Sequence, residues 1–203
     1  GVTDDGNGLT YSFDPAAATV GVHTITYTYT DGNGCTDFIT DDVEVFALPI
    51  LTFTALADLC VDAGVQAGQG GATPSGAGGV YSGTGVTDDG NGLTYSFDPA
   101  AATVGVHTIT YTYTDGNGCT DFITDDVEVF ALPILTFTAL ADLCVDAGVQ
   151  AGQGGATPSG VGGVYSGTGV TDDGNGLTYS FDPAAAGVGV HTITYTYTDG
   201  NGC

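Results

Sequence analysis

The sequence predicts an all-β protein that is built as a tandem array of small β-sandwiches. First, residues 1–119 match residues 85–203 at all but two positions, so the chain repeats every 84 residues. Second, apolar and hydroxyl side chains alternate with a period of two, which is typical of half-buried strands. Third, clusters of Gly, Asn, Asp and Pro interrupt these alternating runs at short intervals, and no helical period is present. We therefore expect an array of repeated units and not a single domain.

The stretch from His23 to Cys35 gives the clearest strand. Its apolar residues Ile25, Tyr27 and Tyr29 alternate with threonines. The run ends in Asp31-Gly32-Asn33-Gly34, where Asn and Gly tolerate the positive φ angles of a tight turn. Residues rich in β-formers then resume from Cys35 to Phe46. This pattern predicts a β-hairpin with a cysteine at its turn, which recurs at residues 107–119 and 191–203.

The repeat divides the chain into three parts. Residues 1–48 are predicted to be the C-terminal part of one unit, residues 49–132 a complete unit, and residues 133–203 a unit that lacks its last strand. The junction from Phe46 to Pro49 has four residues, which are too few for a flexible linker, and the proline stiffens it further. We expect successive units to be joined almost strand to strand.

The complete unit contains about six predicted strands. In chain order they are Leu51–Thr54, the weak strand Val65–Ala67, a strand opening at Val80–Tyr81, Leu93–Phe97, Val106–Thr114 and Cys119–Phe130. A Gly-rich loop precedes the third strand, and an Asp-Pro turn followed by alanines precedes the fifth. Two packed antiparallel sheets are the economical way to bury the apolar faces of these strands.

The charge balance is one-sided, because the chain has 24 Asp and Glu residues and neither Lys nor Arg. Nucleic acid and anionic membrane surfaces are disfavoured as partners, since phosphate binding depends on Lys and Arg, and cations are the natural counterpart. No apolar run is long enough to span a membrane. There is no Met and no signal peptide, and both ends fall inside a repeat. We therefore expect the chain to be a segment of a longer protein.

The five cysteines alternate at intervals of 25 and 59 residues. Pairing over 59 residues keeps both partners inside one unit, so we predict disulfides between Cys60 and Cys119 and between Cys144 and Cys203. Cys35 is then expected to pair with a cysteine upstream of residue 1. A metal site is disfavoured because the sequence contains no CxxC motif and no Cys/His cluster. Disulfides indicate an extracellular location.

Two acidic turns offer oxygen ligands for Ca²⁺, which binds several oxygens at once. The candidate ligands are Asp4, Asp5 and Asn7 in the first turn and Asp31, Asn33 and Asp37 in the second. The calcium-loop pattern fails in both turns, because its third ligand position falls on Leu9 or on Cys35. The competing interpretation is that these residues form turns on an acidic surface. Apart from this possible Ca²⁺, no cofactor is predicted.

An enzymatic function finds little support in the sequence. Ser12, Asp14 and His23 are the residues of catalytic-triad type that lie close together, and no sequence feature holds them in register. The glycine runs lack the spacing of a dinucleotide fingerprint, and no helix follows them. We expect that the chain is not an enzyme.

The ordered motifs of the complete unit carry a family resemblance. They are Cys60, then residues 79–86, residues 97–101, residues 107–113 and residues 115–119. This set resembles the immunoglobulin-like repeats of very large secreted surface proteins of Bacteroidota, including gliding-motility and other adhesins exported by the type IX route. The resemblance covers essentially the whole chain and implies immunoglobulin-like sandwiches placed end to end.

The resemblance and the repeat together lead to a functional expectation. We expect the chain to be the structural stalk of an extracellular, cell-surface adhesin or filament, built as a rigid rod. Its partners would be neighbouring repeats of the same chain, other copies of the filament and cations. The alternative is a multivalent array of glycan-binding or calcium-binding modules. Such modules should expose an aromatic platform, whereas Tyr and Phe here alternate as core positions do.

Overall fold

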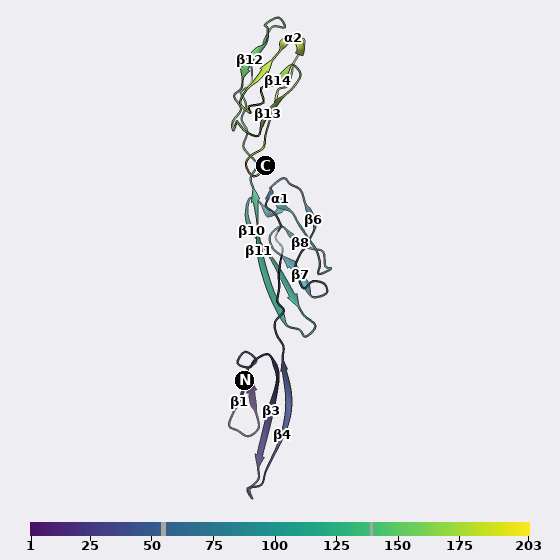
Figure 1. Cartoon of the computed structure of the whole chain (residues 1–203), viewed down its shortest axis with the longest axis vertical. Coiled ribbons are helices and arrows are strands. Elements are labelled where there is room, and N and C mark those ends of the chain that lie inside the picture. The colour runs from purple at the N-terminus through teal and green to yellow at the C-terminus, as the bar shows by residue number, and fades with distance from the viewer. Residues whose placement is uncertain (54–55, 139) are drawn as a thin grey trace.

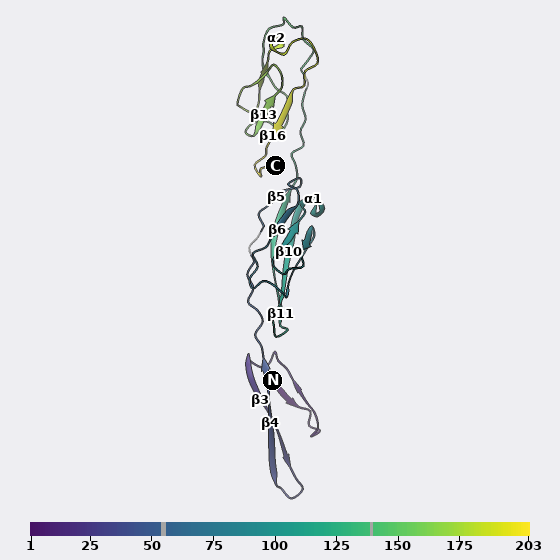
Figure 2. The same cartoon turned by 90° about the vertical axis from the view of Figure 1, so that its right-hand side faces the viewer.

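The computed structural model describes residues 1–53, 56–138 and 140–203. Three β-rich parts follow one another along a single long axis, with the N-terminal part at one end and the C-terminal part at the other (Figures 1 and 2). Over the described residues, no helix has both the length and the apolar character needed to cross a membrane. The molecule is therefore much longer than it is wide.

The N-terminal part consists of two antiparallel hairpins. Strand β1 (Val2–Asp4) pairs with β2 (Tyr11–Phe13), and β3 (Gly21–Thr30) pairs with β4 (Thr36–Val45). The β3–β4 ladder runs from the pair Gly21–Val45 to the pair Thr30–Thr36, beside the turn. Because the period-two pattern is continuous along β3, the predicted hairpin forms over its full length.

The middle part is a sandwich of two sheets. One sheet has the order β5 (Leu59–Cys60), β11 (Thr120–Phe130), β10 (Gly105–Thr114) and β7 (Gly79–Ser82). The other sheet has the order β6 (Gln66–Gln69), β9 (Tyr95–Phe97) and β8 (Val86–Asp88). The predicted all-β sandwich architecture is confirmed.

An aromatic cluster fills the space between these two sheets. The ring centroid of Tyr81 lies 4.6 Å from those of Tyr95 and Tyr111, and all three side chains are buried. Strand β11 completes this core with Val127 and Val129, which are also fully buried. Alternate residues of β7, β9, β10 and β11 thus supply the core, as the sequence pattern predicts.

The C-terminal part repeats this arrangement without counterparts of β5 and β11 among its described residues. Its sheets are β12 (Gln150–Gln153), β15 (Tyr179–Phe181) and β14 (Val170–Asp172), and the pair β13 (Gly163–Ser166) and β16 (Thr194–Tyr197). Strand β16 has four residues, whereas the equivalent β10 has ten. The difference arises because β10 is paired along its whole length with β11, which has no counterpart before Cys203.

The structure differs from the predicted elements in several places, and two strands of the middle part, β5 and β8, were not predicted. Of the strand expected over residues 51–54, the bridge between Thr52 and Thr73 forms, while Thr54 lies outside the described residues. Strand β5 runs parallel to β11, although both sheets were expected to be antiparallel. The expected Asp-Pro turn is a short helix, α1 (Pro99–Ala102), because Asp98 caps its first N–H groups. Its counterpart is α2 (Pro183–Ala186).

Candidate functional site

The loops that follow β3, β10 and β16 each hold a cysteine. In the C-terminal part, the Oδ1 of Asp199 accepts hydrogen bonds from the backbone N–H groups of Asn201 and Cys203, both at 2.9 Å. The backbone N–H of Asp199 in turn donates to the carbonyl of Cys203 at 2.8 Å. The loops that hold Cys35 and Cys119 have the same hydrogen bonds. The tip geometry is therefore built by its aspartate in every copy.

A second cysteine lies at the opposite end of the middle part. Cys60 closes the short strand β5, where it pairs with Phe130, the last residue of β11. The backbone N–H of Val61 donates to the carbonyl of Phe130 at 2.9 Å, and the side chain of Asp58 accepts from the N–H of Glu128 at 2.9 Å. These bonds fix Cys60 at the end of the middle part that faces the C-terminal part, where Figure 2 labels β5.

The structure joins these two kinds of cysteine across the junction between the middle and C-terminal parts. Cys60 and Cys203 form a disulfide with a Cα–Cα distance of 5.5 Å and a sequence separation of 143 residues. Figure 1 places the C-terminal end of the chain beside the same end of the middle part. Within the described part of the chain, Cys35, Cys119 and Cys144 are free.

This pairing corrects the two predicted disulfides, Cys60–Cys119 and Cys144–Cys203. Cys119 lies at the hairpin tip before β11, whereas Cys60 lies beside the last residue of β11. The eleven residues of β11 rise about 3.3 Å each, which separates the two cysteines by roughly 35 Å. The prediction failed because spacing along the sequence does not say at which end of the unit each cysteine lies.

The first acidic turn uses its candidate calcium ligands as hydrogen-bond acceptors. Asp4 accepts from the N–H of Gly6 at 2.8 Å, and Asp5 accepts from the hydroxyl of Thr10 at 2.7 Å. The side-chain oxygen of Asn7 accepts from the backbone N–H of Thr10 at 2.9 Å and from that of the preceding leucine at 2.8 Å. These oxygens therefore hold the turn closed.

In the equivalent turn of the middle part, an aspartate also connects the turn to the sheet. The two carboxylate oxygens of Asp88 accept from the N–H of Gly90 and from the N–H of Tyr81, each at 2.7 Å. Asp172 makes the same pair of bonds in the C-terminal part. These aspartates thus connect the turn to the strand that carries a core tyrosine.

The second acidic turn is the hairpin tip described above. The Oδ1 of Asp31 accepts from the N–H groups of Asn33 and Cys35, and Asp37 accepts from the N–H of Phe38 at 2.9 Å. Donation from the Cys35 N–H, followed by that from Asn33, holds the pKa of Asp31 below its ordinary value of 3.8. Across residues 1–53, 56–138 and 140–203, no group of three or more His, Cys, Asp or Glu is placed to hold a metal ion.

The residues of catalytic-triad type serve local structure. The Nε2 of His23 is hydrogen-bonded to the carbonyl of Thr19, and Asp14 accepts from the N–H of Ala16 at 2.9 Å. Each therefore binds a backbone group close to it in the sequence, and among the described residues neither is hydrogen-bonded to Ser12.

Among the described residues of the middle part, the strand aromatics do not form an exposed platform. Tyr81, Tyr95 and Tyr111 lie in the core, and Tyr113 is half-buried against Tyr111. Phe122 is the exposed aromatic side chain of β11. In this unit the alternating aromatic residues therefore stabilise the sandwich.

Comparisons with known proteins give distant structural likenesses. No family model matches the chain, and no curated protein matches it. Among solved structures that match is a Ca²⁺-stabilized adhesin that helps an Antarctic bacterium reach out and bind ice, with a TM-score of 0.36 and 17% sequence identity. The match covers 87% of this chain and 56% of the adhesin chain, so this chain spans little more than half of the length of the adhesin chain. A likeness of this size carries no argument about function.

Proposed function

We propose that this chain is a segment of a structural stalk in an extracellular adhesin or surface filament. In this proposal, residues 1–48, 49–132 and 133–203 belong to successive units of a rod, and the stalk holds an adhesive end away from the cell. The observation that carries the proposal is the disulfide between Cys60 and Cys203, because it ties one unit to the next. A covalent tie across a junction serves to transmit force and to limit bending.

The geometry of the junction supports this function. The peptide link between the middle and C-terminal parts runs from Phe130, where β11 ends, to Thr136, which bridges to Thr157. The disulfide adds a second covalent connection at the same level of the molecule. Two connections restrict relative rotation far more than one, since a single short linker still permits hinge motion.

The tie also supports the proposed location outside the cell. Disulfides persist in oxidising compartments and are rare where thiols are kept reduced. The absence of Lys from the sequence means that lysine-based isopeptide cross-links cannot form, so disulfides are the covalent brace that this chain can use.

Small-angle X-ray scattering of the oxidised chain tests the stalk. We expect the profile of a thin rod, and we expect the Cys60→Ser variant to bend at the junction between the middle and C-terminal parts. Cys144→Ser is the matched control, because it removes a cysteine that is free in the structure. A profile for the oxidised chain that matches beads on a flexible string would contradict the proposed function.

A further inference from the structure

The disulfide between Cys60 and Cys203 closes a very large loop of the chain. The two cysteines are 143 residues apart in the sequence, yet their Cα atoms lie 5.5 Å apart. An extended chain spans roughly 3.4 Å per residue, so the loop stores about 500 Å of chain length between two neighbouring points. Tension applied N-terminal to Cys60 and C-terminal to Cys203 therefore has a covalent route that omits residues 61–202.

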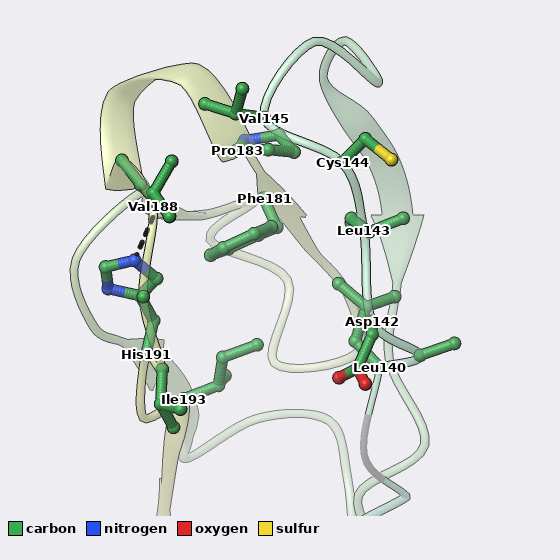
Figure 3. Close-up of a pocket in the computed structure, with 14 residues that line it drawn as sticks. Leu140, Asp142, Leu143, Cys144, Val145, Phe181, Pro183, Val188, His191 and Ile193 are labelled. Atoms are coloured by element: carbon green, nitrogen blue, oxygen red, sulfur yellow. Dashed lines mark hydrogen bonds between the residues drawn. The ribbon is translucent and has the colours of Figure 1, made fainter.

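Both hydrophobic cores lie inside this loop. Among the described residues, the buried core side chains run from Ala72 to Val129 in the middle part and from Ala156 to Phe181 in the C-terminal part. Figure 3 shows the surroundings of Phe181, and every residue labelled there also belongs to the loop. The segment before the loop adds the partly buried side chains of Phe53, Leu56 and Leu59. The covalent route therefore passes outside both cores.

The route through the middle part has little length to release. Residues 49–60 span about 40 Å at full extension. Strand β11, which runs along the same part, already rises roughly 35 Å. Figure 2 shows the chain entering the middle part from the N-terminal part at one end and labels β5, which contains Cys60, at the other end. The distance to be covered is therefore close to the full length of the segment that covers it.

Without the disulfide, tension would pass through the sandwiches themselves. The middle part would be pulled apart at β5 and at the end of β11, which pair over two residue positions. The N–H of Val61 donates to the carbonyl of Phe130, and Asp58 accepts from the N–H of Glu128. So few hydrogen bonds resist shear weakly, and the core behind them would unravel once they break.

We propose that the disulfide makes the stalk resistant to extension, because it carries tension from one unit to the next while both cores remain unloaded. This inference rests on the proposed stalk function and adds which residues bear the load. Residues 49–60 and the bond from Cys60 to Cys203 carry it, and residues 61–202 are shielded. Small, glycine-rich sandwiches can then serve in a tensile fibre, and reduction of one bond converts the rod into an extensible tether.

Single-molecule pulling on the full chain tests the proposal. Handles are attached at both ends by an enzymatic ligation that uses no thiols, and free thiols are blocked. For the oxidised chain we expect lengthening from residues 1–60 alone, which is at most about 200 Å. After dithiothreitol reduces the disulfide in the same molecule, we expect about 500 Å more. Release of this additional length by the oxidised chain would overturn the proposal.

Two variants provide the controls for the pulling experiment. Cys60→Ser should release the additional length without a reductant, whereas Cys144→Ser, which removes a free cysteine, should behave as the oxidised parent chain. A bond from Cys60 to Cys119 would shield the 59 residues between these two cysteines, or about 200 Å, and that result would also contradict the proposal.

The pulling experiment and the scattering experiment can fail separately. Scattering reports whether the oxidised chain is straight, and pulling reports which residues bear the load. A straight oxidised chain that releases the length of residues 61–202 would overturn the load route and leave the stalk function standing. A flexible oxidised chain that keeps this length stored would overturn the stalk function and leave the load route standing.

Discussion

At the scale of single residues, the two positions at which the repeats differ are informative. Thr103 has φ 76° and ψ 172°, a region of backbone space that is essentially restricted to glycine. The equivalent residue in the next repeat is Gly187, which has φ 83° and ψ 179°. The backbone therefore keeps one conformation at the end of the short helix, and glycine adopts it without strain. Nothing in the structure explains the other difference, Ala77 against Val161.

Thr103→Gly should stabilise the middle part. We expect the free energy of unfolding to rise by about 1 kcal/mol, because glycine removes the backbone strain while adding some conformational freedom to the unfolded chain. Chemical denaturation followed by circular dichroism measures this change. Thr124→Gly is the control, since Thr124 lies inside β11 and its replacement should destabilise the strand by roughly 0.5–1 kcal/mol. A loss of stability in Thr103→Gly would contradict the assignment of strain.

Two core tyrosines should respond differently to the removal of their hydroxyl groups. No described residue hydrogen-bonds the hydroxyl of Tyr95, whereas the hydroxyl of Tyr111 donates to the carbonyl of Pro74 at 2.9 Å. We expect Tyr95→Phe to be neutral or stabilising and Tyr111→Phe to cost about 1 kcal/mol in the free energy of unfolding. Thermal or chemical unfolding of both variants checks this. Equal losses in the two variants would show that the hydroxyl of Tyr95 is satisfied in solution.

The raised pKa of Tyr95 predicts that the protein loses stability at alkaline pH. Burial, followed by the nearby Tyr81, raises the pKa of Tyr95 from 10.0 to about 12. The folded protein retains a proton that the unfolded chain releases, so this contribution is complete below pH 10 and is lost as the pH rises from 10 to about 12. We expect Tyr95→Phe to weaken this pH dependence, as measured by denaturation at a series of pH values. If the loss of stability at alkaline pH is unchanged in Tyr95→Phe, groups other than Tyr95 cause it.

At the scale of elements, local patterns were predicted well and long-range pairings were not. The β3–β4 hairpin follows from alternation and turn chemistry within Gly21–Val45, so the sequence contains all that specifies it. The parallel pairing of β5 with β11 joins residues about 70 positions apart, and no local pattern encodes it. The prediction of the disulfide pairing failed for the same reason. The equal spacing of cysteines in every repeat fits bonds within units and bonds between units, and only the three-dimensional arrangement decides between them.

The hairpin tip should lose stability in acid. Hydrogen bonds from Cys35 and Asn33 to Asp31 lower the pKa of this carboxyl below 3.8 in the folded state. The unfolded chain therefore binds the proton first as the pH falls, and the contribution of Asp31, present above about pH 4, is lost as the pH falls through its folded pKa. NMR titration of the Asp31 carboxyl together with the amide shifts of the tip measures this. Asp31→Asn is the control, and an Asp31 pKa at or above 3.8 would contradict the prediction.

At the scale of the whole molecule, the elongated shape and the negative charge act together. About ten carboxylates per repeat repel one another along the rod, and the sequence offers no Lys or Arg to pair with them. The composition therefore predicted the kind of surface, while the candidate calcium ligands remain a prediction whose oxygens already accept hydrogen bonds within their turns. What the composition could not predict is the covalent tie at the junction, because it depends on how neighbouring units face each other.

Divalent cations should compact or bundle the rods gradually. Screening of unpaired carboxylates depends smoothly on ion concentration, so we expect light scattering to rise over the millimolar range without a stoichiometric end point. Monovalent salt at matched ionic strength is the control, and because screening depends on ionic strength it should act to a similar extent. A calorimetric titration with a defined stoichiometry and micromolar Ca²⁺ affinity would instead indicate a true calcium site in each unit.

Peptide mapping without reduction tests the central claim, which is that a disulfide ties one unit to the next. The chain has no Lys or Arg for trypsin, so a protease that cleaves at Asp or Glu, or at aromatic residues, is required. Free thiols are first blocked to prevent exchange, and linked peptides are identified by mass spectrometry. The structure predicts that the peptide containing Cys60 is recovered linked to the peptide containing Cys203, with Cys119 and Cys144 blocked as free thiols. Recovery of Cys60 linked to Cys119, with Cys144 linked to Cys203, would contradict this account.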